Sequence, residues 1–181
     1  MNQENFFHFT NFPDLQKEVI DEGINAKYEW WATPNNFRAE TTTFRRTDLY
    51  RVIVDRFGYC NAAFYKNLPF TYYDWHTDMN RQASVNFVLQ GDDHAHCFYR
   101  GLIDGDPYSK EILERGYSSP LFWQLHKVDY KLYRPTILRS QSKHCVVNVS
   151  PNDRIILSLS IGKTTTTYEE IKQFLSSLVF V

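Results

Sequence analysis

Hydrophobic and polar side chains alternate most regularly in two segments of the chain, 82–90 and 154–161. Within each segment apolar residues occupy every second position, and small polar residues fill most positions between them. The apolar sets are Ala83, Val85, Phe87 and Leu89 in the first segment, and Ile155, Leu157, Leu159 and Ile161 in the second. Because successive side chains of a strand point to opposite faces, this pattern predicts two β-strands, each with one face in the core.

Shorter segments rich in aromatic and β-branched residues predict further strands. They are 6–9, parts of 28–45, and then 50–57, 70–75, 94–100, 136–141 and 145–149. The turn signal Gly91-Asp-Asp separates 82–90 from 94–100. It predicts that these two strands pair as a hairpin.

Helices are predicted near both ends of the sequence. The segment 11–20 has Pro13 in its first turn, and Gly23 is expected to end the helix. Near the other end, Thr167 and Glu170 have the spacing of a capping box. The apolar residues that follow recur at helical spacing: Ile171, Phe174, Leu175 and Leu178. Many strands with helices at the ends predict a mainly β fold, a β-sandwich or jelly roll with the helices packed outside.

The segment 101–130 interrupts the strand pattern. Asp106 and Pro107 predict a short helix that ends near Gly116, and the residues after it show no clear periodicity. A long insertion in a strand-rich domain often serves as a binding loop or lid. We therefore predict one domain over 1–181, with a lid over the functional site at 101–130.

Composition narrows the class of protein further. A chain of 181 residues can bury a sizeable core, and 17% aromatic content indicates a globular protein. A net charge of −1 without long basic runs does not favour a nucleic-acid partner. The cysteines, Cys60, Cys97 and Cys145, lack paired spacing, which indicates thiols of a reducing, cytoplasmic compartment. Neither a signal peptide nor a membrane span is expected.

His76 and Asp78 are the first candidates for chemistry. They are two residues apart, so in an extended segment both side chains leave the same face. A nitrogen of His144, delivered by a distant strand, would complete two imidazoles and one carboxylate around one metal ion. This is the ligand set of non-haem Fe(II) enzymes that activate oxygen. Arg154, ten residues after His144, adds a fixed cation at the head of the last regular strand.

Three other histidines and one arginine are further candidates for the functional site. His94 and His96 form a His-x-His pair, but they follow a turn, where exposed polar residues are usual, and no later ligand spacing matches them. His126 lies in the insertion and is expected to face solvent or substrate. Arg81 follows the His-x-Asp motif and either anchors a substrate carboxylate or forms a plain surface salt bridge, of which the second is favoured.

Five short motifs carry a resemblance to a known family: Trp75-His-Thr-Asp78, Asn86-Phe-Val-Leu, Phe98-Tyr, Lys143-His-Cys-Val-Val-Asn148 and Arg154-Ile-Ile-Leu-Ser-Leu. In order and spacing they resemble those of Fe(II)- and 2-oxoglutarate-dependent oxygenases, and more narrowly the small proteins of this type often met in phage genomes. The likeness covers roughly 51–161. It implies a double-stranded β-helix, which is a jelly-roll, cupin-like core, with flanking helices.

The resemblance also implies roles for the candidate residues. His76, Asp78 and His144 would bind Fe(II) and leave positions for 2-oxoglutarate and O2. Arg154 would bind the distal carboxylate of 2-oxoglutarate through its planar guanidinium. The activity would couple oxidative decarboxylation of 2-oxoglutarate to oxidation of a substrate, most simply its hydroxylation, with ascorbate as reductant in vitro.

Three residues are further candidates for contacts to 2-oxoglutarate: Tyr73, Asn86 and Ser158. Many relatives carry a Ser two residues after the Arg, but this chain has Ile156 at that position, whereas Ser158 stands four residues after Arg154 and on the same strand face. Tyr73 lies three residues before His76, and Asn86 points to the polar face of its strand. Each of the two could instead have a purely structural role.

The sequence is also compatible with two other classes of function. One is a jelly roll that binds ligands without turnover, and the other is a cupin-type metal hydrolase or isomerase. Cupin sites usually carry more histidines, and an inward arginine has no evident use there. Only the oxygenase requires 2-oxoglutarate and releases succinate. The primary substrate is not determined by the sequence, although the resemblance favours a protein or an amino-acid side chain.

Overall fold

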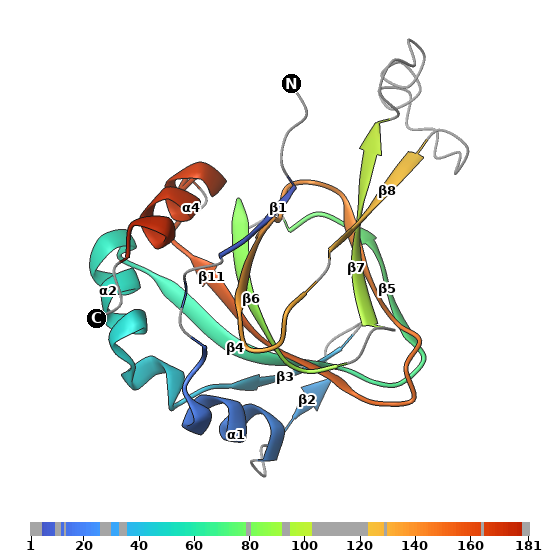
Figure 1. Cartoon of the computed structure of the whole chain (residues 1–181), viewed down its shortest axis with the longest axis horizontal. Coiled ribbons are helices and arrows are strands. Elements are labelled where there is room, and N and C mark those ends of the chain that lie inside the picture. The colour runs from blue at the N-terminus through green and yellow to red at the C-terminus, as the bar shows by residue number, and fades with distance from the viewer. Residues whose placement is uncertain are drawn as a thin grey trace.

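The chain forms two β-sheets with helices outside the larger one, as the computed structural model shows (Figure 1). The structure describes residues 5–9, 12, 14–25, 30–32, 36–78, 81–91, 95–102, 123–128, 130–163 and 165–178. The fold is mainly β with a jelly-roll core, which confirms the predicted fold class.

The larger sheet has seven strands, all paired antiparallel. In spatial order they are β1 (Phe6–His8), β9 (Pro135–Arg139), β6 (Ala83–Gln90), β11 (Arg154–Ile161), β4 (Cys60–Asn67), β3 (Phe37–Glu40) and β2 (Trp31–Ala32). The smaller sheet has four: β5 (Thr71–His76), β10 (His144–Asn148), β7 (Ala95–Leu102) and β8 (Trp123–Val128).

The two faces of the larger sheet differ in chemistry, as the alternating pattern predicts. On β6 and β11 the apolar sets named above are buried in the main hydrophobic core. The intervening residues Ser84, Asn86, Arg154, Ile156 and Ser158 line a cavity on the opposite face. Burial of one leucine such as Leu157 or Leu159 contributes roughly 1.5–3 kcal/mol. The strands are thus held by their apolar face while the polar face stays available for a ligand.

Three α-helices and one short 3-10 helix are present among the described residues. They are α1 (Lys17–Asn25), η1 (Phe44–Arg46), α2 (Asp48–Phe57) and α4 (Tyr168–Ser177). α1 contacts β6 and β11, α2 contacts β4, and α4 contacts β9, so the α-helices cover the apolar face of the larger sheet (Figure 1). The predicted capping box of α4, made by Thr167 and Glu170, is confirmed. None of the helices in the described part of the chain is long and apolar enough to cross a membrane.

The strand predicted at 50–57 is wrong, because these residues form most of α2. The side chain of Thr47 accepts a hydrogen bond from Tyr50 N at 3.2 Å and caps the helix. Gly58 adopts φ 72° and ends it in the left-handed conformation that glycine tolerates. The β-branched residues suggested a strand, but caps at both ends and burial of Ile53 on one helical face outweigh that preference.

The first helix also differs from its prediction. α1 begins at Lys17 and continues to Asn25, so Gly23 lies inside the helix instead of ending it. A Cβ added to Gly23 would lie 2.4 Å from Leu89 Cδ1 and 2.9 Å from Phe64 Cε1. Glycine is therefore required here by close packing of the helix on β4 and β6.

The predicted hairpin of 82–90 with 94–100 is contradicted. β6 pairs with β9 and β11 in the larger sheet, whereas β7 pairs with β10 and β8 in the smaller one. The chain passes from one sheet to the other between these strands, as is typical of a jelly roll.

Part of the predicted lid is a strand. The segment 123–128 forms β8, paired with β7, which the sequence pattern did not reveal. The short helix predicted near 106–116 and most of the remaining insertion, 103–122, lie outside the described residues. The lid therefore stays a prediction.

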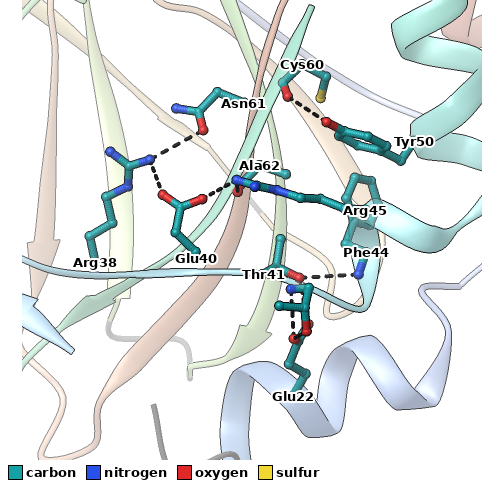
Figure 2. A network of polar contacts seen from close by, with 11 residues as sticks. Glu22, Arg38, Glu40, Thr41, Phe44, Arg45, Tyr50, Cys60, Asn61 and Ala62 are labelled. Carbon is teal, nitrogen blue, oxygen red and sulfur yellow. Dashed lines mark hydrogen bonds and ion pairs between the residues drawn. The ribbon is translucent and has the colours of Figure 1, made fainter. Parts of the chain in front are cut away.

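One buried carboxylate joins α1 to the segment after β3. Glu22 is 8% exposed and accepts a hydrogen bond from Thr41 Oγ1 at 2.6 Å (Figure 2). It also accepts hydrogen bonds from Thr42 N at 2.9 Å, Thr42 Oγ1 at 2.6 Å and Thr43 N at 3.1 Å. Burial raises the pKa of Glu22, but these hydrogen bonds outweigh it and hold the pKa below the ordinary value of 4.5. The ionised form is thus the one that the fold stabilises.

Replacing Glu22 with Gln should lower the free energy of unfolding by about 2 kcal/mol at pH 7, because an amide cannot accept this many hydrogen bonds. A pKa lowered on folding stabilises the protein above pH 4.5 and ceases to do so as the pH falls through the folded-state pKa. The difference between the two proteins in urea unfolding should therefore shrink in acid. Glu18→Gln, on the exposed side of the same helix, should change stability by a few tenths of a kcal/mol.

Candidate metal centre

Two histidines come together where the smaller sheet faces the cavity. His144 opens β10 and lies directly opposite His76, the last residue of β5, in the antiparallel pair. Their ring centroids are 4.3 Å apart. The register of β5 and β10 therefore joins two residues that are 68 positions apart in the sequence.

Both imidazoles are oriented by a backbone carbonyl. His76 Nδ1 lies 2.6 Å from the carbonyl oxygen of Asp74, and His144 Nδ1 lies 2.9 Å from that of Ser142. A carbonyl oxygen only accepts, so Nδ1 of each ring donates in this contact, and Nε2 is the nitrogen that we assign to the metal. Burial lowers the pKa of His144, which favours the neutral ring that binds metals.

Asp78 completes the group just beyond the end of β5. Its backbone N donates to the Ser140 carbonyl at 2.9 Å, and its Oδ2 accepts from Arg81 Nε at 2.8 Å. The other carboxylate oxygen, Oδ1, lies 4.0 Å from His76 Nε2. Burial raises the pKa of Asp78, but the charge and hydrogen bond of Arg81 outweigh this and lower it. The residue is therefore an anion with one oxygen held and one directed toward the histidines.

The donor set fits a divalent metal ion. One ligand atom from each of His76, Asp78 and His144 lies within 4.8 Å of the other two. A point central to three such atoms is no more than about 2.8 Å from each. Bonds of roughly 2.0–2.2 Å thus need shifts of about 0.8 Å or less. Metal-binding histidines usually donate the N–H of the other ring nitrogen to a carbonyl or carboxylate, as His76 and His144 do here.

Arg154 lies in the same cavity as the three predicted ligands. The cavity measures about 330 Å³ and lies between the two sheets, with residues of β5, β10, β4, β6 and β11 among its lining. Arg154 is 2% exposed; its Nη1 donates to Asn67 Oδ1 at 3.2 Å, and its guanidinium lies 5.2 Å from the ring centre of Tyr130. Among the described residues, its Nε has no hydrogen-bond partner and no carboxylate pairs with it. A buried cation without a counterion calls for an anion in the cavity.

The other predicted contact residues also line this cavity. Tyr73 stacks on His76 with ring centroids 4.0 Å apart. Asn86 and Ser158 lie opposite each other on β6 and β11, and Asn86 Oδ1 is enclosed with no hydrogen-bond partner in the described part of the chain. Their positions suit contacts to a ligand, while the roles themselves stay predictions.

Arg81 forms an ion pair, as expected, but not on the surface. Its partner is Asp78, its side chain is 23% exposed, and its Nη1 donates to Ser160. It is therefore a residue that orients a predicted metal ligand. The competing pair is not tested: His94 and the side chains of His96 and His126 lie outside the described residues.

Sequence reasoning missed several cavity residues: Arg38, Tyr65, Asn67, Cys97 and Tyr130. Tyr130 is hydrogen-bonded to Asn86 and Cys97, and Asn67 contacts Arg154. No motif marked them, because their positions depend on which strands become neighbours. Burial raises the pKa of Cys97 to about 12, which keeps it a thiol beside the predicted metal ligands.

Asn148 connects the two turns that support the cavity. It is 1% exposed, and its Nδ2 donates to the carbonyls of Asn67 at 3.2 Å, Leu68 at 3.0 Å and Asn152 at 2.9 Å. Its Oδ1 accepts from Ser150 N at 3.2 Å. One amide thus ties the turn between β4 and β5 to the turn between β10 and β11.

Replacing Asn148 with Asp should destabilise the fold by about 2–4 kcal/mol and more than replacement with Ala, because a carboxylate would face three carbonyl oxygens. Chemical denaturation of the two variants measures the order. Asn25→Asp, exposed at the end of α1, is the matched control and should change stability by less than about 0.5 kcal/mol. Equal stability of Asn148→Asp and wild type would contradict the assigned hydrogen bonds.

Comparison with known proteins gives a consistent result at the level of the fold. No protein-family model matches the sequence, and no curated protein matches it. Among solved structures, a prolyl-4-hydroxylase from Pseudomonas putida has a TM-score of 0.56 at 13% identity, covering 88% of this chain and 92% of that one. HygX from Streptomyces hygroscopicus, with nickel, 2-oxoglutarate and hygromycin B bound, has a TM-score of 0.55 at 10% identity, covering 91% and 85%.

A third similar structure is SnoN, a non-heme α-ketoglutarate-dependent epimerase from nogalamycin biosynthesis. Its TM-score is 0.54 at 8% identity, covering 87% of this chain and 78% of that one. At these identities the likeness shows the fold alone. The fold of this chain is similar to the folds of these three proteins, and its described residues include a His-Asp-His group with the spacing of metal ligands.

Proposed function

We propose that this protein is an Fe(II)- and 2-oxoglutarate-dependent oxygenase, most simply a hydroxylase. One observation carries the proposal: His76, Asp78 and His144 share a single cavity with Arg154, a buried cation that has no described counterion. A metal and a fixed cation on facing sheets suit a dianion with carboxylates at both ends. The similar fold of HygX, which has nickel and 2-oxoglutarate bound, supports the same proposal.

In this proposal His76 and His144 each bind the metal through Nε2, and Asp78 binds it through one carboxylate oxygen. Asp78 supplies the only ligand charge, and Arg81 keeps its second oxygen engaged. Bound Fe(II) would supply the capacity to use O2 for oxidative decarboxylation of 2-oxoglutarate and oxidation of the substrate.

Arg154 binds the distal carboxylate of 2-oxoglutarate in this scheme. Asn67 and the ring of Tyr130 hold its guanidinium in place, so little conformational freedom is lost on binding. A charge-assisted hydrogen bond of this kind contributes about 1.5–3 kcal/mol. Ser158 and Asn86 line the same cavity from the same sheet face as Arg154 and can add hydrogen bonds.

Apolar side chains complete the cavity. Leu138, Val146 and Ile156 line it between the polar groups. They limit the water that reaches the metal and strengthen the electrostatic interactions inside. Ile156, at the position where many relatives carry Ser, thus contributes to this apolar wall and offers no hydrogen bond.

Succinate release tests the proposal. Protein loaded anaerobically with Fe(II) and given 2-oxoglutarate, ascorbate and air should form succinate slowly without a primary substrate. A jelly roll that only binds ligands would bind 2-oxoglutarate without forming succinate. A cupin-type hydrolase or isomerase would show no need for 2-oxoglutarate. Either result would contradict the oxygenase.

A further inference from the structure

Arg38 lies at another part of the same cavity, on the face of the larger sheet that carries Arg154. It is directly opposite Tyr65 on β4, and Tyr65 is directly opposite Ile156 on β11. All three line the cavity. Arg154 lies two strands away from Arg38 in the sheet and two residues before Ile156 along β11. Ordinary strand geometry therefore places the two Cα atoms about 12 Å apart.

The charge of Arg38 is only partly neutralised. Its Nη2 donates to Glu40 Oε1 at 2.7 Å and to Asn61 Oδ1 at 3.3 Å, while Arg45 pairs with the other oxygen of Glu40 (Figure 2). One carboxylate is therefore shared by two guanidinium groups. The Nε of Arg38 is enclosed and has no partner among the described residues. An unsatisfied donor of this kind is uncommon and points to a missing ligand.

Aromatic rings keep the guanidinium of Arg38 in position. Its centre lies 5.7 Å from the ring of Trp31 and 5.9 Å from that of Tyr65. Trp31 is 44% exposed and the side chain of Arg38 is 26% exposed, so the guanidinium is partly accessible to solvent. An arginine fixed by rings on an accessible side remains able to bind a further anion.

The charges that line the cavity also favour an anion. Among the described lining residues there are three arginines, Arg38, Arg81 and Arg154, and one carboxylate, Asp78, which Arg81 neutralises. The charges of a divalent metal and of doubly charged 2-oxoglutarate cancel, which leaves Arg154 and Arg38, the latter partly neutralised by the Glu40 that it shares with Arg45. The site therefore keeps a positive potential after the co-substrate has bound.

We propose that Arg38 is a specificity-determining residue and that the primary substrate is a small organic anion, a carboxylate or a phosphate ester. Its anionic group would pair with Arg38, and its apolar body would lie along Tyr65 and Ile156 toward the metal. The cavity of about 330 Å³ is at the lower end of the range for small-molecule sites. This inference rests on the proposed function for the order of binding and the charge balance.

Three phenyl compounds test the inference: 3-phenylpropionate, its uncharged amide, and 2-phenylethyl phosphate. Each is titrated by calorimetry into full-length protein that holds Zn(II) and saturating 2-oxoglutarate, so that the Arg154 position is already filled. We expect at least one anion to bind about tenfold or more tightly than the amide, as a charge-assisted hydrogen bond implies. Comparison of the two anions distinguishes a carboxylate from a phosphate substrate.

Variants then assign the effect to Arg38. Arg38→Gln should remove the preference for the anion, and Arg38→Lys should keep part of it. Arg46→Gln removes the same charge from an exposed residue of η1 that does not line the cavity, and should leave the preference unchanged. In wild type, the ¹H–¹⁵N resonance of Arg38 Nε should shift as the anion binds, which a purely structural arginine would not show.

Equal binding of anions and amide, or a preference that survives in Arg38→Gln, would overturn the inference and leave the proposed function intact. Failure of 2-oxoglutarate to bind the metal-loaded protein would instead contradict the proposed function. In that event the same titrations are made with metal alone, and the same difference between wild type and Arg38→Gln decides the role of Arg38.

Discussion

Asp78→Ala should reduce metal affinity by more than about a hundredfold and abolish succinate formation. Removal of a residue that only hydrogen-bonds to a metal ligand typically weakens metal binding ten- to a hundredfold, and removal of a ligand itself should weaken it more. Asp78 is a ligand itself in our assignment and carries the only ligand charge that balances the dication. Its backbone bond to Ser140 does not depend on the side chain, so the strands that carry His76 and His144 should keep their register.

Competition with a chromophoric chelator for Ni(II) or Mn(II) measures the affinity of the Asp78→Ala protein. Asp74→Ala removes the same charge four residues earlier, from an exposed carboxylate that accepts from Trp75 N at 2.6 Å and Tyr72 Oη at 2.8 Å. That control should retain the metal, because the Asp74 carbonyl that orients His76 is unchanged. Undiminished affinity in Asp78→Ala would mean that the metal ligands are wrongly assigned.

Strands with one apolar face could be predicted from sequence because burial imposes a period of two. β11 was predicted with its observed bounds, and β6 within one residue. The division of each strand into an apolar core face and a second face was predicted as well; that the second face lines a cavity was not. The capping box of α4 was equally visible, since its four residues interact locally. In these elements, local pattern and tertiary packing favour the same structure.

The errors occurred where packing overrides a local preference. Residues 50–57 contain β-branched and aromatic side chains, yet Thr47 and Gly58 cap them as a helix that buries Ile53. Gly23 resembled a helix end, whereas its function is to allow contact with Leu89. The supposed hairpin followed from closeness in sequence, while a jelly roll sends successive strands to different sheets.

The candidate site divides in the same way. The spacing of His76 and Asp78 is local, and the placement of His144 and Arg154 followed from motif order, so these four could be named in advance. Arg38, Tyr65 and Tyr130 could not. They reach the cavity only through the pairing of β3 with β4 and the packing of a segment after β8, and neither leaves a local signal.

Arg154→Lys should weaken 2-oxoglutarate binding by about 1–3 kcal/mol, or from fivefold to more than a hundredfold, and leave metal affinity unchanged. Lysine keeps the charge but offers a point donor on a flexible stem, so the planar contact to a carboxylate is lost. The contacts to Asn67 and to the ring of Tyr130, which hold the guanidinium in place, are lost as well. Because Arg154 contacts only the distal carboxylate in our proposal, the loss of affinity should be confined to ligands that have this carboxylate.

Pyruvate provides the test of that last point, because it has the keto acid of 2-oxoglutarate but no distal carboxylate. Calorimetric titration of the Ni(II)-loaded protein should show the full loss for 2-oxoglutarate in Arg154→Lys and almost none for pyruvate. Arg139→Lys, which changes an arginine paired with Glu169 outside the cavity, should affect neither ligand. An equal loss for both keto acids would indicate a general disturbance of the cavity, and no loss for either would remove Arg154 from the binding site.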